Sequence, residues 1–495
     1  MHYKFKSYIF AACIFLTSLR KFIDMKNKQT LSRRGFLKTS AIGAAGVIVA
    51  PTIVPSSVFG AHAPSNRILV GAIGCGRQGR GVMTNIMRYA DTRIVAVCDL
   101  DSVRLAEAKQ FTESTTEKFH GAPHSGVKTY EDYRELLLNK EIDAVMIATP
   151  DHQHARLAID AAWAGKDMYL EKPTALTISE GRMMSNAMNA TGRIMQIGSQ
   201  QRSNKEFRRA CELVRSGRIG QLKTVEVRLP GDPPGGNPNP MPVPKNLNYD
   251  AWLGSTPDVP YTVDRVHPQT KPDGTADFGR PGWLRCEQFG AGMITGWGSH
   301  HFDIAHWAMD TEYTGPIEIS ASTTFPAPGS GLWNVHGPYH SEMLYANGVV
   351  VKGMEEGLAK PNGVLFIGSE GWIFVSRGGE RVTDSDPIKI DSGGLEKGPL
   401  SASNPKILSE LTDNDVHLYV SENHVRNWLD CTRSRALNIT PAEIAHRSCT
   451  VCLLQQVAMH LKRKLYWDPK AERFVNDDEA NTWLSRPQRA PYAIR

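Results

Sequence analysis

The sequence predicts an α/β protein whose N-terminal half is a doubly wound parallel sheet, and three observations lead to that fold class. A short apolar run ends in a glycine-rich turn at residue 74, and a helical pattern follows at once. Apolar runs typical of strands then alternate with helical patterns as far as residue 197, which is the signature of parallel βαβ units. Hydrophobic residues make up 41% of the 495 and charged residues 22%, the ordinary usage of a chain that buries a large core.

The elements of this half follow one another regularly along the chain. Strands are predicted at 67–73, 93–98, 144–147, 168–170 and 194–197, and helices from the end of the glycine-rich turn to 89 and at 102–113, 131–138, 155–164 and 179–190. Parallel sheets of this kind bind their ligands beyond the carboxyl ends of the strands. The residues that directly follow each strand are therefore the candidates for function.

The glycine-rich turn after the first strand has the spacing of a dinucleotide-binding motif. Residues 74–79 read Gly-Cys-Gly-Arg-Gln-Gly, which is G-x-G-x-x-G between a strand and a helix. Gly74 makes the tight turn, Gly76 lets the backbone approach a pyrophosphate, and Gly79 lets the helix pack closely on the strand. Amides at the start of the helix then face the anion. We predict that Gly74, Gly76, Arg77, Gln78 and Gly79 bind the cofactor.

Asp99 is the candidate for recognising the adenosine ribose. It ends the second strand about 25 residues beyond Gly74, close to the spacing of a ribose-binding acid. A carboxylate there accepts hydrogen bonds from the ribose hydroxyls and repels a 2′-phosphate, which favours NAD. NADP stays open as an alternative, because Arg104 lies one helical turn further on and can hold a phosphate. The other interpretation of Asp99 is a cap for the helix at 102–113.

Lys172 is the candidate for proton transfer. It follows a buried strand and precedes a proline, which restricts its backbone and directs the side chain out of the strand end. A partly desolvated ammonium group beside a nicotinamide cation has a lowered pKa and can relay the proton of an alcohol. The alternative is a solvated lysine paired with Glu171.

The second half of the chain has fewer signals. A strand is predicted at 222–229, and the seven prolines of 230–244 exclude a central strand there. Residues 364–376 predict a hairpin, and 424–431 and 442–461 predict helices. Cys449 and Cys452 lie on one face of the last helix. Because the seven cysteines beyond residue 63 are odd in number and scattered, we expect core packing and no disulfide framework.

Four features in order resemble one family of enzymes. They are the turn at Gly74, Thr149-Pro150 with His154, Glu171-Lys172-Pro173, and Gly298-Ser299-His300-His301-Phe302-Asp303. Together they resemble the Gfo/Idh/MocA family of nucleotide-dependent sugar and cyclitol oxidoreductases, and residues 297–305 look like its exported branch. The resemblance runs from about residue 67 to near the C-terminus.

The resemblance implies both a domain plan and a set of site residues. It implies a Rossmann domain over 64–200, and an α+β domain over 201–495 with a mostly antiparallel open sheet and C-terminal helices that pack back on the first domain. The family's catalytic lysine and histidine map onto Lys172 and His300. Cofactor contacts are implied for Thr149, Pro150, His154, Glu171 and Lys172. Many members have an acid four residues before the histidine, where this chain has Gly296.

Residues near the last strand of the first domain and around His300 are candidates for substrate binding. Gln201 and Arg202 follow that strand, and Trp297 suits stacking on a pyranose ring. His301 and Asp303 complete the predicted substrate set. We predict no metal site, because adjacent histidines point to different faces and no third cluster of ligands is apparent.

The first 63 residues have the pattern of a twin-arginine export signal. Ser32-Arg33-Arg34-Gly35-Phe36-Leu37-Lys38 precedes an apolar run too short to span a bilayer. We expect the natural start at Met25, cleavage near Ala61 to Ala63, a periplasmic protein and no transmembrane span after cleavage. This leader holds nine Lys and Arg against one Asp, which leaves 48 bases and 50 acids elsewhere, so nucleic-acid binding has no support.

Taken together, the sequence predicts an exported oxidoreductase. We expect hydride transfer between an alcohol carbon of a sugar, glycoside or cyclitol and a tightly bound NAD(H), with a small carbohydrate as substrate. Two alternatives stay open: an NAD-dependent glycoside hydrolase that oxidises a ring carbon transiently, and a non-catalytic sugar-binding protein. The resemblance alone implies a homo-oligomer.

Overall fold

The computed structural model describes residues 66–355, 361–378 and 398–494. The predicted export signal, with its twin arginines and Met25, lies outside these residues. Residues 61–495 form one compact unit. Within the described residues, no helix combines the length and apolar character needed to cross a membrane.

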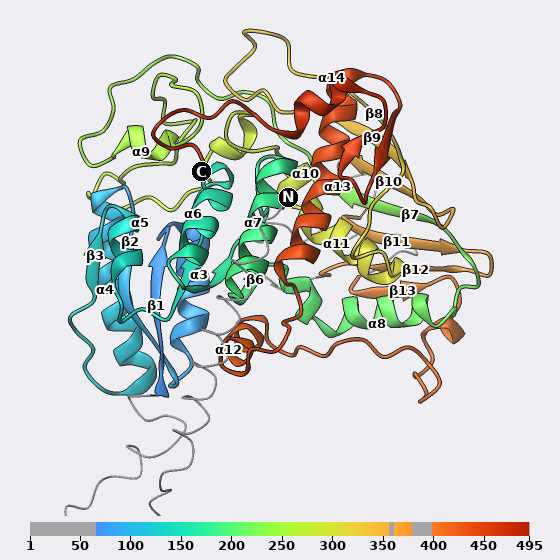
Figure 1. Ribbon diagram of the computed structural model, residues 1–495, viewed down its shortest axis with the longest axis horizontal. Helices are drawn as coiled ribbons and strands as arrows, with labels where there is room; N and C mark the ends of the chain where they lie inside the picture. Colours follow the sequence, from blue (N-terminus) through green and yellow to red (C-terminus); the bar gives the residue numbers. More distant parts are fainter. Residues whose placement is uncertain (1–65, 356–360, 379–397, 495) are drawn as a thin grey trace, which may run out of the picture. The chain divides into compact units, whose positions relative to one another are not determined.

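The N-terminal half contains a six-stranded parallel sheet in the order β3-β2-β1-β4-β5-β6 (Figure 1). Its strands are β1 (Ile68–Ile73), β2 (Thr92–Cys98), β3 (Lys128–Tyr130), β4 (Ala144–Ile147), β5 (Asp167–Leu170) and β6 (Met195–Ile197). Its helices are α3 (Arg77–Met87), α4 (Ser102–His120), α5 (Tyr133–Leu138), α6 (Asp151–Trp163) and α7 (Ile178–Thr191). This strand order is that of a Rossmann dinucleotide-binding fold, which confirms the predicted fold class.

Two boundaries differ from the predicted ones by four residues or more, and one strand was not predicted, each for an identifiable reason. α4 runs seven residues beyond 113, because Thr112 and Thr116 are buried in it although their polarity interrupts the apolar pattern. α6 begins at Asp151 and not at 155, because its first turn is polar. Strand β3 has no buried residue, so no apolar run marks it in the sequence.

The second half is built on a nine-stranded sheet in the order β13-β12-β11-β7-β10-β9-β8-β14-β15. Its strands are β7 (Leu222–Leu229), β8 (Glu318–Thr323), β9 (Tyr339–Leu344), β10 (Val350–Glu355), β11 (Gly363–Gly368), β12 (Trp372–Val375), β13 (Leu400–Ala402), β14 (Leu465–Asp468) and β15 (Arg473–Phe474). All described pairs are antiparallel except β7 with β10. The predicted strand 222–229 and the hairpin β11–β12 are therefore confirmed.

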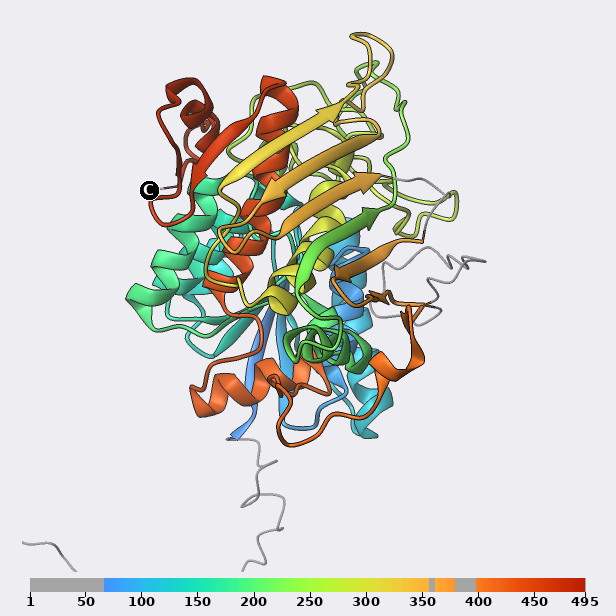
Figure 2. The same ribbon diagram turned by 90° about the vertical axis from the view of Figure 1, so that its right-hand side faces the viewer.

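Helices cover one face of this larger sheet. They include α8 (Lys205–Arg215), α11 (Gly298–Met309) and α13 (Ala442–Leu461), with the short α9 (Tyr249–Leu253), α10 (Met293–Gly296) and α14 (Asp478–Asn481) elsewhere in this half. Figure 2 looks onto the sheet with α11 and α13 behind its strands. Residues of β9 alternate between buried and exposed, so the other face of the sheet is open.

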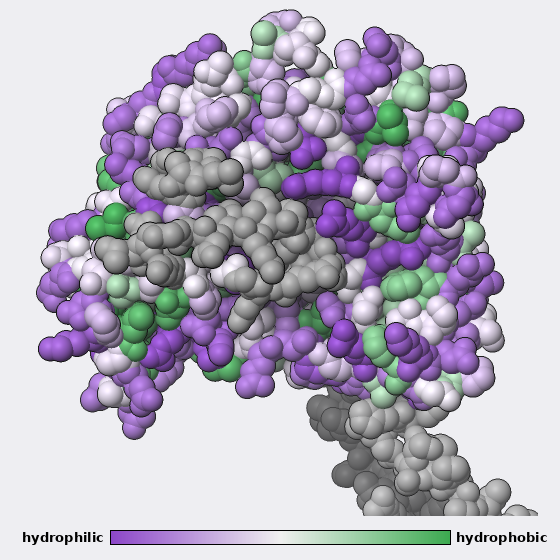
Figure 3. Space-filling view, turned by 180° about the vertical axis from the view of Figure 1, so that it is seen from behind, coloured by the Kyte–Doolittle hydropathy of each residue, from purple (hydrophilic) through white to green (hydrophobic). Residues whose placement is uncertain are grey.

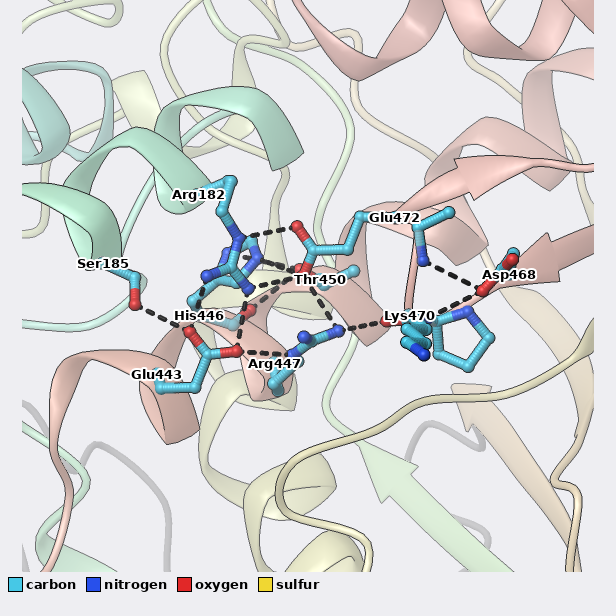
Figure 4. Close-up of polar contacts among 11 residues, drawn as sticks. Arg182, Ser185, Glu443, His446, Arg447, Thr450, Asp468, Lys470 and Glu472 are labelled. Atoms are coloured by element: carbon cyan, nitrogen blue, oxygen red, sulfur yellow. Dashed lines mark hydrogen bonds and ion pairs between the residues drawn. The ribbon is translucent and has the colours of Figure 1, made fainter. Parts of the chain in front are cut away.

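The C-terminal helices return to the parallel sheet. α12 (His424–Ser434) adds Val425, Trp428 and Leu429 to the apolar core beneath β1 and α3. α13 packs against α7, where Figure 4 shows a network of ion pairs. Cys449 and Cys452 are free and buried inside α13, as core packing predicts.

The surface drawn in Figure 3 is mainly hydrophilic. Outside the grey residues, hydrophobic side chains form only small spots among polar ones on this face. Isolated spots of this size are ordinary for a folded protein and do not indicate a partner.

Candidate functional site

A cavity of about 650 Å³ lies beyond the carboxyl ends of β1, β2, β4 and β5. This is where ligands bind in doubly wound sheets, and the volume is that of a small-molecule site. The predicted residues that line it are Gly74, Gly76, Arg77, Gln78, Asp99, Thr149, Pro150, His154, Glu171, Lys172, Trp297 and His300. Thus residues of the parallel sheet and of the second half share one cavity.

The glycine turn has the geometry that its spacing predicts. Gly74 has φ +84°, and a Cβ there would lie 2.6 Å from the carbonyl oxygen of Ala148. Gly79 does not line the cavity, because it packs so closely on Gly74 that a Cβ would collide with the Gly74 carbonyl. α3 starts next to Gly76 without a side-chain cap, so its first amides are available to an anion. The turn therefore fits a dinucleotide pyrophosphate.

Asp99 braces this turn and borders the cavity. Its Oδ2 accepts a hydrogen bond from the Cys75 amide at 2.8 Å, and its Oδ1 accepts one from the Asp101 amide at 3.0 Å. Each oxygen keeps a second lone pair for a ribose hydroxyl. The interpretation of Asp99 as a helix cap is wrong, because Asp101 caps α4 by accepting from the amides of Val103 and Arg104.

Lys172 reaches across the cavity to the second half. Its Nζ donates to the carbonyl oxygen of Gly296 at 3.0 Å. Burial lowers the pKa of Lys172, and Arg377 acts in the same direction, while Glu171 and Asp151 partly offset both. The lysine is held by a neutral carbonyl and not by an ion pair with Glu171, so its lowered pKa suits proton transfer.

His300 faces the same cavity from α11. The side chain is buried, and its Nδ1 has no hydrogen-bond partner. Burial, together with Arg377 and Lys172, holds the pKa of His300 well below its usual range. The imidazole is therefore neutral near pH 7 and can accept or pass a proton.

Two predicted cofactor residues connect the ends of strands. His154 places Nδ1 2.6 Å from the Pro173 carbonyl oxygen and Nε2 2.8 Å from that of Thr149, which ties the end of β4 to the end of β5. Glu171 accepts a hydrogen bond from Gln78 Nε2 at 2.9 Å, which ties the glycine turn to β5. Both residues thereby fix the loop that carries Lys172.

Four of the five predicted substrate-binding residues do not line the cavity: Gln201, Arg202, His301 and Asp303. Arg202 and Asp303 form a buried ion pair, with Nε 2.7 Å from Oδ2. His301 Nε2 lies 3.0 Å from Asn362 Oδ1. Gln201 sits between the His300 carbonyl and Arg377 when its amide is turned to satisfy both. This geometry does not support direct substrate contacts from these residues, because other groups of the chain already engage them.

The structure also adds cavity residues that the sequence did not single out. Asp151 is buried at the start of α6, and its Oδ2 has no partner. Burial raises the pKa of Asp151 to about 8, although Lys172 opposes the shift. Arg280 and Arg377 also line the cavity. Asp151 follows the strand β4 closely, which was a usable signal, whereas Arg280 and Arg377 lie in segments without a periodic pattern.

Several residues that line this cavity have buried polar atoms without a hydrogen bond to any described residue. These atoms include Thr149 Oγ1, Asp151 Oδ2, Glu171 Oε2 and His300 Nδ1. Buried polar groups are rarely left in this state in a folded protein, so such atoms indicate a bound polar ligand. Together with the glycine turn and Asp99, they fit a dinucleotide and a hydroxylated substrate.

Comparison with family models covers most of the chain. Residues 68–199 match an oxidoreductase family with an NAD-binding Rossmann fold, and residues 235–376 and 369–494 match the C-terminal α/β domain of an oxidoreductase family. The two matches confirm the predicted fold class and an NAD-binding first half.

Curated relatives match over less than half of their own length. A protein of Shewanella pealeana named "Glycosyl hydrolase family 109 protein" is 30% identical over 207 residues, which are 39% of this chain and 44% of that protein. The "Uncharacterized oxidoreductase YrbE" of Bacillus subtilis is 30% identical over 163 residues, 33% of this chain and 44% of that protein.

Solved structures show the same fold at low identity. The WlbA dehydrogenase of Bordetella pertussis, solved with NADH and UDP-GlcNAcA, has a TM-score of 0.55 at 17% identity over 81% of this chain and 99% of that one. A levoglucosan dehydrogenase, solved with NADH and levoglucosan, has a TM-score of 0.54 at 17% identity over the same shares.

Proposed function

The chain belongs to the Gfo/Idh/MocA family of oxidoreductases, and from that premise we propose that it transfers a hydride between an alcohol carbon of a sugar, glycoside or cyclitol and a tightly bound NAD(H). One observation carries the proposal. Lys172 from the parallel sheet and the carbonyl of Gly296, two residues before α11, meet in the cavity that the glycine turn and Asp99 border.

The residues divide the work of binding NAD. The glycine turn holds the pyrophosphate, Asp99 the adenosine ribose, and the ends of β4 and β5 border the nicotinamide end of the cavity. When bound, NAD supplies the hydride acceptor or donor. Thr149 and Glu171 have buried oxygens without partners there, and these are available to the cofactor.

Lys172 and His300 manage the proton of the alcohol. A lysine with a lowered pKa is a stronger acid when charged and is more often neutral near pH 7, so it can take the alcohol proton or return it. His300 is neutral and offers an unpartnered Nδ1. Asp151 adds a buried carboxyl group with a raised pKa on the cavity wall, where it can share a proton with Lys172.

We further propose that the protein works in the periplasm as a homo-oligomer. The twin-arginine motif before an apolar run supports export of the folded, cofactor-loaded chain. Free dinucleotide is scarce outside the cytoplasm, so a resident cofactor must be recycled within the cavity. Fractionation of cells, and light scattering of the purified protein, test the location and the oligomer.

A glycoside hydrolase that uses NAD is the second candidate. It is favoured by the relative named as a family 109 glycosyl hydrolase, 30% identical over 207 residues. In that reaction, oxidation of a ring carbon acidifies the neighbouring C–H, and loss of that proton and of the aglycone leaves a double bond. Water from solvent adds to the double bond, and the hydride then returns to the oxidised carbon. Cleavage of an aryl glycoside without net change of the nicotinamide distinguishes this reaction from net dehydrogenation.

A sugar-binding protein without turnover is the third candidate, and Gly296 favours it because an acid is missing there. In that case the wild-type protein binds sugars but transfers no hydride, and Lys172→Ala leaves the binding unchanged. Hydride transfer by the wild-type protein that Lys172→Ala abolishes excludes this candidate.

The deciding experiment is mass spectrometry of the nucleotide released when the purified, dialysed protein is denatured. The proposal expects NAD(H) in a one-to-one ratio with the chain. NADP instead overturns the role given to Asp99. A protein that arrives empty and also ignores added dinucleotide overturns the oxidoreductase and favours the sugar-binding protein.

A further inference from the structure

One segment of the second half reaches back to the nucleotide-binding helix. Residues 264–281, here called the strap, lie between β7 and α11 in an irregular conformation. The strap contacts the start of α4, from which it is separated by more than 160 residues of sequence. Ordering a segment against a part of the chain so far away in sequence costs conformational entropy, which favourable contacts must offset.

Hydrogen bonds anchor the strap to two side chains of α4. Arg104 Nη2 donates to the carbonyl oxygens of Pro268 at 3.0 Å and Asp277 at 2.6 Å. The amide of Ala276 donates to Glu107 Oε1 at 2.7 Å, and Glu107 Oε2 in turn accepts from Arg80 of α3 at 3.2 Å. All three anchors involve an ionised side chain, which makes such bonds stronger than neutral ones.

An aromatic ring and a histidine add to these anchors. The ring of Phe278 lies 4.1 Å from the Arg80 guanidinium carbon and 5.2 Å from that of Arg104, which are cation–π contacts. His267 Nε2 lies 3.2 Å from Asp101 Oδ2, on the residue that caps α4. The strap is therefore fixed to α3 and α4 at several points along its length.

The strap forms part of the wall of the nucleotide cavity. His267, Gly279, Arg280 and Pro281 line the cavity together with Asp99 and Arg104. Upstream of the strap, the Asn248 amide donates to the Leu100 carbonyl oxygen at 3.0 Å. A nucleotide whose ribose lies against Asp99 is thus bordered by the strap on the side where α4 begins.

We propose that the strap retains the nucleotide, and that Glu107 and Phe278 are positioning residues that slow its release without lining the cavity. This inference rests on the proposed function, because it assumes a bound dinucleotide. With the anchors made, the adenosine side of the cavity is walled by strap and α4 together. The nucleotide leaves on that side only after the strap detaches, so weaker anchors give faster exchange.

The test compares nucleotide exchange in purified, nucleotide-loaded full-length proteins. Isotopically labelled NAD is added in excess, and mass spectrometry follows replacement of the bound NAD with time. Glu107→Ala removes the acceptor for the Ala276 amide, and Phe278→Ala removes the ring between Arg80 and Arg104. We expect exchange at least about tenfold faster in each, as for the loss of one charge-assisted contact.

A matched control lies on the same helix. Glu117 of α4 is exposed, and its carboxylate has no hydrogen bond or ion pair within the described part of the chain, so Glu117→Ala makes the same change of charge away from the strap. The control is expected to exchange at the wild-type rate. Faster exchange in both strap variants but not in the control supports the inference.

Failure of the strap and failure of the proposed function give different results. Two results overturn the proposal that the strap retains the nucleotide: exchange of NAD within seconds in the wild-type protein, or exchange at the wild-type rate in the strap variants. Neither result bears on hydride transfer. Wild-type protein that holds no dinucleotide and binds none overturns the proposed function itself. Since Phe278→Ala leaves the hydrogen bonds of α4 intact, it decides the question if Glu107→Ala does not fold.

Discussion

Two polar regions of this protein contrast sharply in how their groups are partnered. Where α7 meets α13, Arg182 donates to both oxygens of Glu443, at 2.7 and 2.8 Å, and to both oxygens of Glu472, at 2.7 and 2.8 Å (Figure 4). In the cavity, by contrast, Asp151 Oδ2 and His300 Nδ1 are buried without a hydrogen-bond partner among the described residues. The first region holds two parts of the fold together, and the second leaves its polar groups for a ligand.

The same contrast appears in the pKa values of the carboxyl groups. Despite partial burial, hydrogen bonds from Arg182, Ser185 and Arg447 lower the pKa of Glu443 to about 2. Burial raises the pKa of Asp151 to about 8. Substitutions in the first region should therefore cost stability, and substitutions in the second should cost activity.

The largest effect is expected for Lys172→Ala. Loss of the group that moves the proton should lower the rate of hydride transfer by about 10²- to 10⁴-fold. Because the lysine makes one described hydrogen bond, to the Gly296 carbonyl, the melting temperature should change little compared with this loss of rate. The absorbance of the reduced nicotinamide measures the rate, and the amount of nucleotide released on denaturation measures the bound cofactor.

The control is Lys205→Ala, which removes an exposed lysine of α8. A Lys172→Ala variant with the full wild-type rate contradicts the assignment.

The next effect is expected in the ion-pair network. Arg182→Met removes the shared donor of two carboxylates and should lower the free energy of unfolding by about 2–3 kcal/mol, measured by urea denaturation. Nucleotide content should not change. Lys128→Met is the control, since its pair with Glu141 at 3.0 Å is more than half exposed and should contribute little to the free energy of unfolding. Equal losses of unfolding free energy in the two variants would contradict the stabilising role of the Arg182 ion pairs.

The comparison of the two regions also predicts that Glu443 and Asp151 change the stability of the protein with pH in opposite directions. Glu443 has a folded pKa below its usual 4.5, so its stabilisation is present above pH 4.5 and is lost as the pH falls toward about 2. Asp151 has a folded pKa above its usual 3.8, so stability is lost as the pH rises from about 4 toward about 8. Glu443→Gln should flatten the acid limb of the stability profile, and Asp151→Asn the limb toward pH 8.

Thermal melts across this range measure both limbs for the wild-type protein and the two variants. Glu117→Gln, which changes an exposed carboxylate on α4, is the control and should change neither limb. If Asp151→Asn leaves the profile unchanged, the pKa of Asp151 is not raised in the folded protein, and its carboxyl group holds no proton near pH 7.

The sequence predicted those parts of the molecule in which local pattern and environment agree. Strand β4 is apolar throughout and buried throughout, and its predicted bounds are the observed ones. The turn at Gly74 was identified by its G-x-G-x-x-G spacing, and in the structure Gly74 has a positive φ close to the Ala148 carbonyl oxygen, which only glycine fits. Helix α13 was equally clear, because nearly all its residues are buried.

The remaining parts depend on contacts between distant residues. Arg202 was predicted to bind substrate because it follows the last strand of the first domain, and Asp303 because it belongs to the motif around His300, yet they form an ion pair across 101 residues of sequence. Arg377 and Arg280 reach the cavity from irregular segments with no periodic pattern. Local sequence reports neither which charge is paired nor which loop folds over a cavity.

The smallest predicted effect compares two buried tyrosines at the ends of β9, one whose hydroxyl has a hydrogen-bond partner among the described residues and one whose hydroxyl has none. Tyr339 begins β9 and Tyr345 follows its end, and both side chains are fully buried. The hydroxyl of Tyr345 lies 2.6 Å from His306 Nε2, whereas that of Tyr339 has no partner. Tyr345→Phe should therefore cost about 1–2 kcal/mol, since it leaves a buried histidine nitrogen unpaired, and Tyr339→Phe should cost nothing or stabilise slightly.

Urea denaturation of the two variants side by side measures this difference, with nearly the same volume removed in each. A cost of about 1 kcal/mol or more for Tyr339→Phe would mean that a buried water satisfies its hydroxyl in the folded protein. A polar atom that binds such a water does have a hydrogen-bond partner. The same measurement of unfolding free energy should therefore be made for the Thr149 hydroxyl. There Thr149→Val removes a hydroxyl that lines the cavity without a partner. If the Thr149 hydroxyl binds the cofactor, Thr149→Val should weaken the binding of NAD. It should leave the free energy of unfolding of the nucleotide-free protein unchanged.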